Sequence, residues 1–180
     1  MSPTINVQQL SKTYQVPERE GGFGAAVRSF FKRKYKDVKA VQRVDFKIEQ
    51  GEIVGFLGPN GAGKSTLLLA LARLIKPASG QMMFNGSPIS KMDDLEYRRK
   101  ISFVFQDPLL MDMTVANNIA LGLKFRGTDK EEIRKRVARW SKAMGVESLL
   151  GRRAGQLSGG EAQRVSLARA FVLDPELLLM

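Results

Sequence analysis

The sequence contains neither cysteine nor histidine. Without cysteine, disulfide bonds and thiol chemistry are excluded, and a structural zinc site is not expected because zinc ligation in proteins relies on these two residue types. The absence of histidine also excludes histidine-based acid–base catalysis. Long apolar runs are missing too. The most apolar stretch, around Thr66–Ile75, is short and interrupted by Arg73, so no segment has the roughly 18 apolar residues that span a bilayer.

The remaining composition is typical of one globular domain. The chain has 180 residues, of which 43% are hydrophobic and 26% are charged, which is enough to form a real core. Met1–Leu10 has neither the basic region nor the apolar region of a signal peptide. We therefore expect a soluble, cytoplasmic protein.

Positive charge is concentrated in two stretches. The formal net charge is +11, and residues 28–43 carry +6 of it while residues 124–142 carry +5. Such stretches contact nucleic acid, anionic lipid headgroups or acidic partners, or they form a solvated face.

Hydrophobic periodicity predicts alternating strands and helices, which favours an α/β fold with a largely parallel sheet. We expect residues 11–42 to be irregular because Pro17 and three nearby glycines interrupt them, and Glu49–Glu52 to form a turn. The predicted strands are 4–10, 41–48, 53–57, 81–84, 101–105 and 177–180. The predicted helices are 65–75, 114–121, 130–144 and 158–173.

A glycine-rich motif of the form G-x-x-x-x-G-K-[ST] lies between the apolar run Ile53–Leu57 and the predicted helix 65–75. Its glycines allow backbone N–H groups to converge on phosphate oxygens. We expect Lys64 to contact the β- and γ-phosphates and the Ser65 hydroxyl to bind Mg²⁺. The nucleotide-binding residues of this loop are Gly58, Pro59, Asn60, Gly61, Ala62, Gly63, Lys64, Ser65 and Thr66.

A second segment, Leu157-Ser158-Gly159-Gly160-Glu161, combines a helix cap with two poor helix formers. Ser158 and Glu161 have the spacing of a capping box. Each glycine costs about 1 kcal/mol relative to alanine inside a helix, so the pair favours close approach of a ligand to the backbone. A helix start of this kind is a candidate second anion site.

A phosphate loop followed about ninety residues later by L-S-G-G-E-x-Q-R resembles the ATP-binding subunits of ABC transporters, over nearly the whole chain. The resemblance implies a P-loop NTPase-type sheet, an N-terminal antiparallel β portion and a helical subdomain. Residues 1–84 and 101–106 would form the core, about 107–165 the helical subdomain, and 166–180 the return to the core.

The resemblance further implies ATP hydrolysis with Mg²⁺, coupled to transport across a membrane. Two ATP-binding domains would form a head-to-tail homodimer or heterodimer, in which Ser158, Gly159, Gly160 and Glu161 of one cover the nucleotide on the other. Transmembrane permease subunits would be the partners, on the cytoplasmic face of the membrane, with no nucleic acid bound. A soluble ATPase of this superfamily acting in translation or DNA repair is the alternative. A small P-loop kinase would leave Leu157–Glu161 unexplained.

Three further residues follow from the resemblance. Gln106 would lie near Mg²⁺ and the attacking water, and the segment after it would contact the membrane subunits. An aromatic side chain would stack on adenine. Two tyrosines are candidates: the sequence context points to Tyr14, whereas the spacing from the loop points to Tyr35, which we favour.

Two features concern the direction of transport and the turnover of ATP. Residues between Tyr14 and Tyr35 resemble an insertion of exporter-type subunits, whereas Thr114–Ile119 and Lys130–Arg164 are closer to importer subunits, so the sequence does not decide between import and export. The family's catalytic glutamate would follow Met180, so we expect a truncated chain that does not turn over ATP alone.

Overall fold

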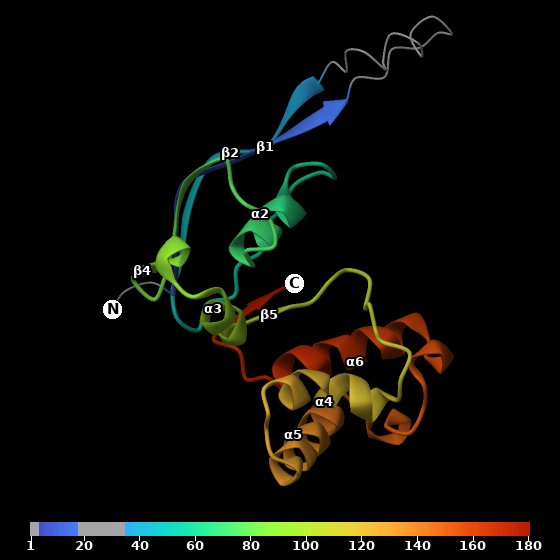
Figure 1. Ribbon diagram of the computed structural model, residues 1–180. Helices are drawn as coiled ribbons and strands as arrows, with labels where there is room; N and C mark the ends of the chain where they lie inside the picture. The colour runs from blue at the N-terminus through green and yellow to red at the C-terminus, as the bar shows by residue number, and fades with distance from the viewer. Residues whose placement is uncertain (1–3, 18–34) are drawn as a thin grey trace, which may run out of the picture. The chain divides into compact units, whose positions relative to one another are not determined.

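The computed structural model describes residues 4–17 and 35–180, and the chain divides into two compact units, Met1–Met92 and Asp93–Met180 (Figure 1). Residues 28–34 of the first basic stretch lie outside the described residues.

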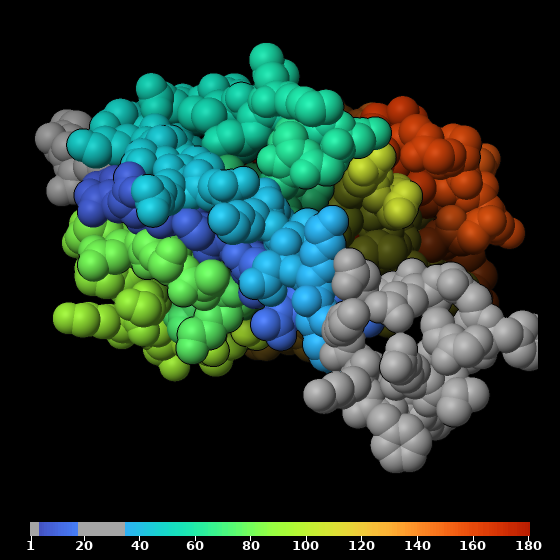
Figure 2. Space-filling model, turned by 90° about the horizontal axis from the view of Figure 1, so that it is seen from above, coloured from blue at the N-terminus to red at the C-terminus, as the bar shows by residue number. Residues whose placement is uncertain are grey.

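The first unit contains a four-stranded antiparallel sheet in the order β2-β1-β3-β4. Its strands are β1 (Ile5–Pro17), β2 (Tyr35–Ile48), β3 (Ser79–Phe84) and β4 (Ser87–Pro88). In the space-filling view, the dark blue β1 lies between β2 and the green β3 (Figure 2). Alternate apolar residues bury one face: Ile5, Val7, Leu10, Val41, Ile48 and Phe84. The predicted strands 4–10, 41–48 and 81–84 are confirmed.

Residues 11–17 and 35–42 are not irregular, as the glycines and Pro17 suggested, but continue β1 and β2 as a two-stranded ribbon. Tyr14 is opposite Val38 and Pro17 is opposite Tyr35. The prediction was wrong because the ribbon is stabilised by backbone pairing, while its outer side chains are exposed. Such strands need no apolar alternation in their sequence.

The turn at Glu49–Glu52 is confirmed, with Gly51 at φ +84° and the Glu52 amide donating to the Glu49 carbonyl. The apolar run after it is not the buried strand that we predicted. Ile53 and Leu57 are each 97% exposed, and 53–57 has no strand partner among the described residues. An apolar run becomes a strand only where neighbouring strands pair with its N–H and C=O groups.

Helix α2 (Lys64–Leu71) buries Leu67, Ala70 and Leu71 but is shorter than the predicted helix 65–75. It ends at Ala72 because Arg73 adopts φ +54°, which is outside the helical region. The Arg73 guanidinium instead donates to the carbonyls of Ile89 and Met92, at the two ends of the short 3₁₀ helix η1 (Ile89–Lys91). A polar contact distant in sequence thus sets the length of α2.

The second unit contains a parallel pair of strands and a helical bundle. Helix α3 (Asp94–Lys100), which the sequence did not predict, leads into β5 (Ile101–Phe103), and β5 pairs with β6 (Leu177–Leu179). The remaining helices are α4 (Val115–Phe125), α5 (Lys130–Ala143) and α6 (Gly159–Phe171), with 3₁₀ helices η2 (Glu147–Leu149) and η3 (Ala154–Gln156). The predicted helices 114–121, 130–144 and 158–173 and strand 177–180 are confirmed. The predicted strand 101–105 ends two residues earlier.

The bundle core is apolar and is supplied by one stripe of each helix. Its buried members are Val115, Ile119, Ala120, Leu123, Val137, Val146, Leu149, Val165, Ala168 and Val172. The predicted stripe of α5 packs here, with Val137 buried and Ile133, Trp140 and Met144 partly buried. The Trp140 ring stacks on Phe171 of α6 at a centroid distance of 4.8 Å.

Arg126 joins the carboxyl ends of two helices. Its guanidinium donates to the carbonyl of Arg99 in α3 at 2.7 Å and to that of Leu173, just after α6, at 3.0 Å. Burial lowers the pKa of Arg126, and the nearby cations Arg99 and Arg136 lower it further. A cation at these carbonyls offsets the negative ends of both helices.

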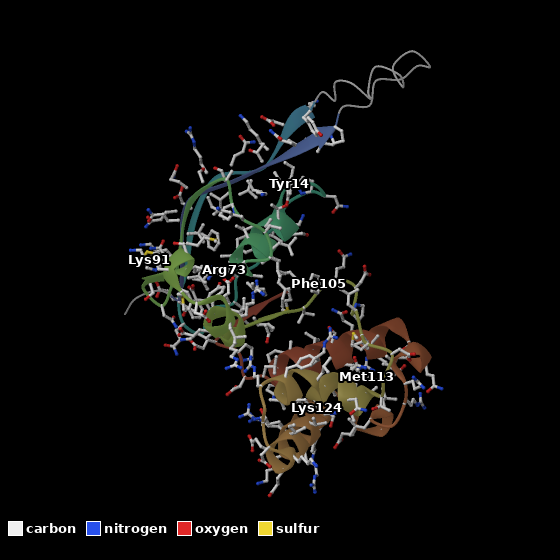
Figure 3. The ribbon with its side chains drawn as sticks, viewed as in Figure 1. Tyr14, Arg73, Lys91, Phe105, Met113 and Lys124 are labelled. Carbon is white, nitrogen blue, oxygen red and sulfur yellow. The ribbon has the colours of Figure 1, made fainter. Side chains whose placement is uncertain are left out.

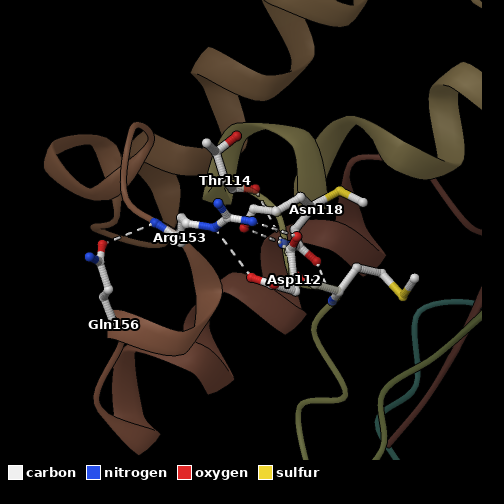
Figure 4. A network of polar contacts seen from close by, with 7 residues as sticks. Asp112, Thr114, Asn118, Arg153 and Gln156 are labelled. Atoms are coloured by element: carbon white, nitrogen blue, oxygen red, sulfur yellow. Dashed lines mark hydrogen bonds and ion pairs between the residues drawn. The ribbon is translucent and has the colours of Figure 1, made fainter.

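The buried Asn118 of α4 organises the backbone before that helix (Figure 4). Its carboxamide accepts from the Met111 amide at 2.8 Å and donates to the carbonyls of Met111, Met113 and Thr114. One side chain therefore hydrogen-bonds four backbone groups at the end of the irregular segment and the start of α4.

Helix α6 begins with a complete capping box. The Ser158 hydroxyl accepts from the Glu161 amide, and the Glu161 carboxylate accepts from the Ser158 amide at 2.7 Å and from its hydroxyl at 2.8 Å. The backbone and then the side-chain hydrogen bond from Ser158 lower the pKa of Glu161. Charge at this carboxylate therefore stabilises the helix start.

Replacing Asn118 by alanine removes the four hydrogen bonds that its buried carboxamide makes with the backbone, so we expect N118A to lower the free energy of unfolding by about 2–4 kcal/mol. Urea denaturation measures this. The matched control is N117A on the exposed side of the same helix, where Asn117 accepts only from the exposed Lys124 and about 0.5 kcal/mol or less is expected. Equal stability of the two variants would contradict this role.

The Glu161 carboxylate gives a pH-dependent contribution. Because its folded pKa is lowered, the contribution is present above the ordinary glutamate pKa and is lost as the pH falls through the folded value. Wild type should be more stable than E161Q near neutral pH, and the difference should disappear in acid. Thermal denaturation between pH 7 and 3 tests this. A difference that does not change over that range would show that the charge has no role.

Candidate nucleotide-binding site

The glycine-rich loop Gly58–Thr66 leads directly into α2 and is fixed by a contact at its last glycine. Gly63 is the N-cap of α2 and has φ +84°. A Cβ on Gly63 would overlap the carbonyl oxygen of Ala40 in β2. Glycine is thus required here twice, for its backbone conformation and for its close approach to β2.

The start of α2 is open to an anion. No side chain caps this helix end, and its first internal hydrogen bond runs from the Leu67 amide to the Gly63 carbonyl. The N–H groups of the first turn carry the positive end of the helix dipole. The loop before them is mostly exposed, with Gly61 also at φ +84°. The backbone N–H groups of the loop and of the first turn of α2 are therefore accessible to an anionic ligand, because the glycines carry no side chains that would block them.

Lys64 lies across the loop. Its ammonium donates to the carbonyl oxygens of Gly58 at 2.6 Å and Pro59 at 2.9 Å. In the described parts of the chain, no acidic side chain forms an ion pair with it. A full positive charge shared only by neutral carbonyls is suited to a phosphate oxygen.

The donor set around the loop also fits magnesium. The Ser65 side chain is exposed and supplies a hydroxyl oxygen. Over residues 4–17 and 35–180 there is no cluster of three or more carboxylate, imidazole or thiolate ligands. Mg²⁺ is often held by one or two protein oxygens together with water and substrate phosphates, so Ser65 is adequate as a protein ligand.

The two candidate tyrosines both belong to the β1–β2 ribbon, at different distances from the loop. Tyr14 is paired with Val38, two residues from Ala40, whereas Tyr35 is five residues from Ala40. At about 3.3 Å per residue, these positions are roughly 7 and 17 Å along β2 from the contact with Gly63. Tyr14 is 36% exposed, and the ammonium of Lys12 lies 5.1 Å from its ring (Figure 3).

The second unit holds the other predicted residues. Ser158, Gly159, Gly160 and Glu161 form the exposed start of α6, where the hydroxyl and carboxylate are engaged in the capping box. Arg152 and Arg164 place positive charge near Glu161, and both lower its pKa slightly. Arg152 and Arg164 thus place positive charge beside a helix start that already holds the Glu161 carboxylate, and this start is a candidate anion site.

Gln106 follows β5, but not directly. The strand ends at Phe103, the Val104 amide donates to the Leu179 carbonyl, and Gln106 is exposed in the irregular segment after it. Sequence reasoning missed the side chain that holds this segment. Arg169 of α6 donates to the carbonyls of Pro108 and Leu109. Burial lowers its pKa, and a single arginine within a helix gave no signal in the sequence.

Across the described residues, no helix is both long and apolar enough to cross a membrane. The model of the family described as "ABC transporter" matches residues 41–180. The chain is 41% identical over 149 residues to the sn-glycerol-3-phosphate import ATP-binding protein UgpC of Chromohalobacter salexigens. The match covers 82% of this chain and 40% of the relative. It is 43% identical over 148 residues to the methionine import ATP-binding protein MetN 1 of Listeria monocytogenes, covering 80% and 44%. The chain thus spans less than half the length of these relatives.

Solved structures agree with the fold. A dimeric post-hydrolysis state of the ATP-binding cassette MJ0796, bound to ADP and Pi, matches with a TM-score of 0.78 and 32% identity, covering 97% of this chain and 72% of that one. The cbiO1 structure from Clostridium perfringens, part of the ABC transporter complex cbiONQ, matches with a TM-score of 0.77 and 28% identity, covering 99% and 64%. These matches confirm the expected α/β nucleotide-binding fold. Together with the loop geometry and the family match, they show that the chain belongs to the ABC transporter family, in its ATP-binding part.

Proposed function

We propose that this chain is the ATP-binding component of an ABC transporter and that it couples hydrolysis of Mg-ATP to transport. The observation that carries the proposal is the uncompensated Lys64 ammonium over a loop whose glycines leave its backbone open. Relatives named as import ATP-binding proteins support it, and they favour import over export. They also favour transport over translation or DNA repair.

In this proposal the loop binds the phosphates. The N–H groups at the start of α2 and the Lys64 ammonium donate to phosphate oxygens, and the Ser65 hydroxyl is a ligand of Mg²⁺. The metal would neutralise charge on the transferred phosphoryl group. Gln106 is proposed to position the attacking water, from the exposed end of its segment.

For the adenine ring we propose Tyr14 rather than Tyr35. Its position along the ribbon is closer to the place where β2 touches Gly63. Stacking on a flat ring needs only one exposed aromatic face, and Tyr14 is partly exposed.

We propose that two ATP-binding domains pair head to tail, as homodimer or heterodimer. Ser158, Gly159 and Gly160 of one would donate to the nucleotide held by the loop of the other. The dimeric structure of the similar cassette MJ0796 supports the pairing of two such domains. Membrane-spanning permease subunits would contact the segment after Gln106 from the cytoplasmic side. The relatives import chemically different compounds, which is consistent with substrate choice by the partners.

If the loop binds phosphate through Lys64, K64M should weaken ATP binding by about 30- to 100-fold, which corresponds to the loss of one or two charge-assisted hydrogen bonds. Isothermal titration calorimetry on the full-length protein measures this. K91M, an exposed lysine of the same unit, should bind like wild type. Unchanged affinity in K64M would refute the proposed site.

If Ser158 contacts the nucleotide of the other subunit, S158A should leave ATP binding to one subunit unchanged but weaken dimerisation. Two equivalent contacts, each worth about tenfold, predict a roughly 100-fold higher dimer dissociation constant. Light scattering with a non-hydrolysable ATP analogue measures it, with the exposed Ser148 as control in S148A. Equal dimerisation of S158A and wild type would exclude this role.

A further inference from the structure

The irregular segment between β5 and α4 is held at both ends but is exposed along its middle. Its first amide, of Val104, donates to Leu179, and its last turn is held by Asn118. Between these points three large apolar side chains, Phe105, Leu109 and Met111, are exposed to solvent. A partner that binds to these side chains would contact a stretch of backbone that has no regular secondary structure to hold it in place.

Arg169 holds the middle of this segment. Its two terminal nitrogens donate to successive carbonyls, to Pro108 at 2.9 Å and to Leu109 at 3.0 Å. Leu109 adopts φ +43°, a left-handed conformation that leucine rarely takes. The planar guanidinium matches two neighbouring acceptors, which a lysine ammonium cannot reproduce with the same geometry.

A second connection runs to the loop before α6. The Val115 amide donates to the Arg152 carbonyl, and the Ala154 amide donates to the Met113 carbonyl. The Arg153–Asp112 ion pair lies beside them (Figure 4), but its side chains are 63% and 84% exposed, so it contributes little. Of the two side-chain links, the half-buried Arg169 is the stronger.

We infer that Arg169 is a positioning residue that fixes the segment after Gln106 to helix α6, so that the two move as one body. Arg169 is ten residues after Gly159, which is about 15 Å along a continuous helix. A displacement of Leu109 by a partner is therefore passed to the start of α6 at Ser158. The functional half of this inference rests on the proposed function, whereas the mechanical half does not.

Hydrogen exchange tests the mechanical half on the full-length protein. In R169M, peptides covering residues 105–113 should exchange about 10- to 100-fold faster, because two charge-assisted hydrogen bonds are lost, while peptides of α6 keep their protection. R169K should be intermediate. The control R134M, at an exposed arginine of α5, should match wild type.

Exchange of residues 105–113 in R169M within twofold of wild type would overturn the inference. If every peptide of R169M exchanges faster, the variant has lost its fold. The exchange of residues 105–113 in R169K is then compared with that of wild type instead. Wild-type exchange at residues 105–113 in folded R169K would also overturn it.

Steady-state kinetics test the functional half on the protein assembled with its membrane partners. R169M should lower partner-stimulated kcat by on the order of tenfold, with an unchanged KM for ATP, because the nucleotide loop is not altered. A stimulated kcat equal to that of wild type and of R134M would overturn it. Absence of ATP turnover in wild type would instead refute the proposed function, and the exchange result would still stand on its own.

Discussion

The contact between Gly63 and the Ala40 carbonyl sets the geometry on which the nucleotide loop depends. No side chain fits between them. The backbone of β2 therefore packs directly against the first residue before α2 and fixes where that helix begins. The position of that helix start places the first-turn N–H groups, and it also brings Lys64 over the carbonyls of Gly58 and Pro59. The chemistry of the loop is thus largely a property of the main chain, with one cation added.

In the second unit, side chains rather than main-chain contacts fix the backbone of the connecting segments. Asn118, Arg126 and Arg169 each donate to carbonyls of segments that lie outside regular elements. Two of the three bind across tens of residues of sequence, and they tie α3, α4 and α6 to the connections between them. In this way side chains hydrogen-bond backbone groups at helix ends and in irregular segments. The apolar core of the bundle supplies the driving force for packing. These polar contacts set the backbone conformation of the segments that connect the helices.

What the sequence could predict followed from local rules. The loop Gly58–Thr66, the capping box at Ser158 and the apolar stripes of α5 and α6 are short-range patterns with a direct physical cause, and the structure has all of them. Features that depend on partners distant in sequence were missed. Ile53–Leu57 has the composition of a strand but has no paired neighbour among the described residues, and the β1–β2 ribbon has the pairing but not the composition. Arg73 and Arg169 donate to carbonyls 16 and 60 residues away. Local hydrophobic patterns and capping motifs give no signal for contacts of this kind.

The open start of α2 at Lys64 affects which ligands the loop accepts. Main-chain N–H groups and an ammonium recognise charge and shape, and they are indifferent to the sugar and base attached beyond them. Pyrophosphate and every common nucleoside triphosphate present the same oxygens to this loop. In the proposed site, discrimination among purines and pyrimidines would therefore come from elsewhere, and a tyrosine stacked on the base would offer little of it, because every base has a π face. Selectivity for adenine in a cell would then depend as much on the abundance of each nucleotide as on the protein.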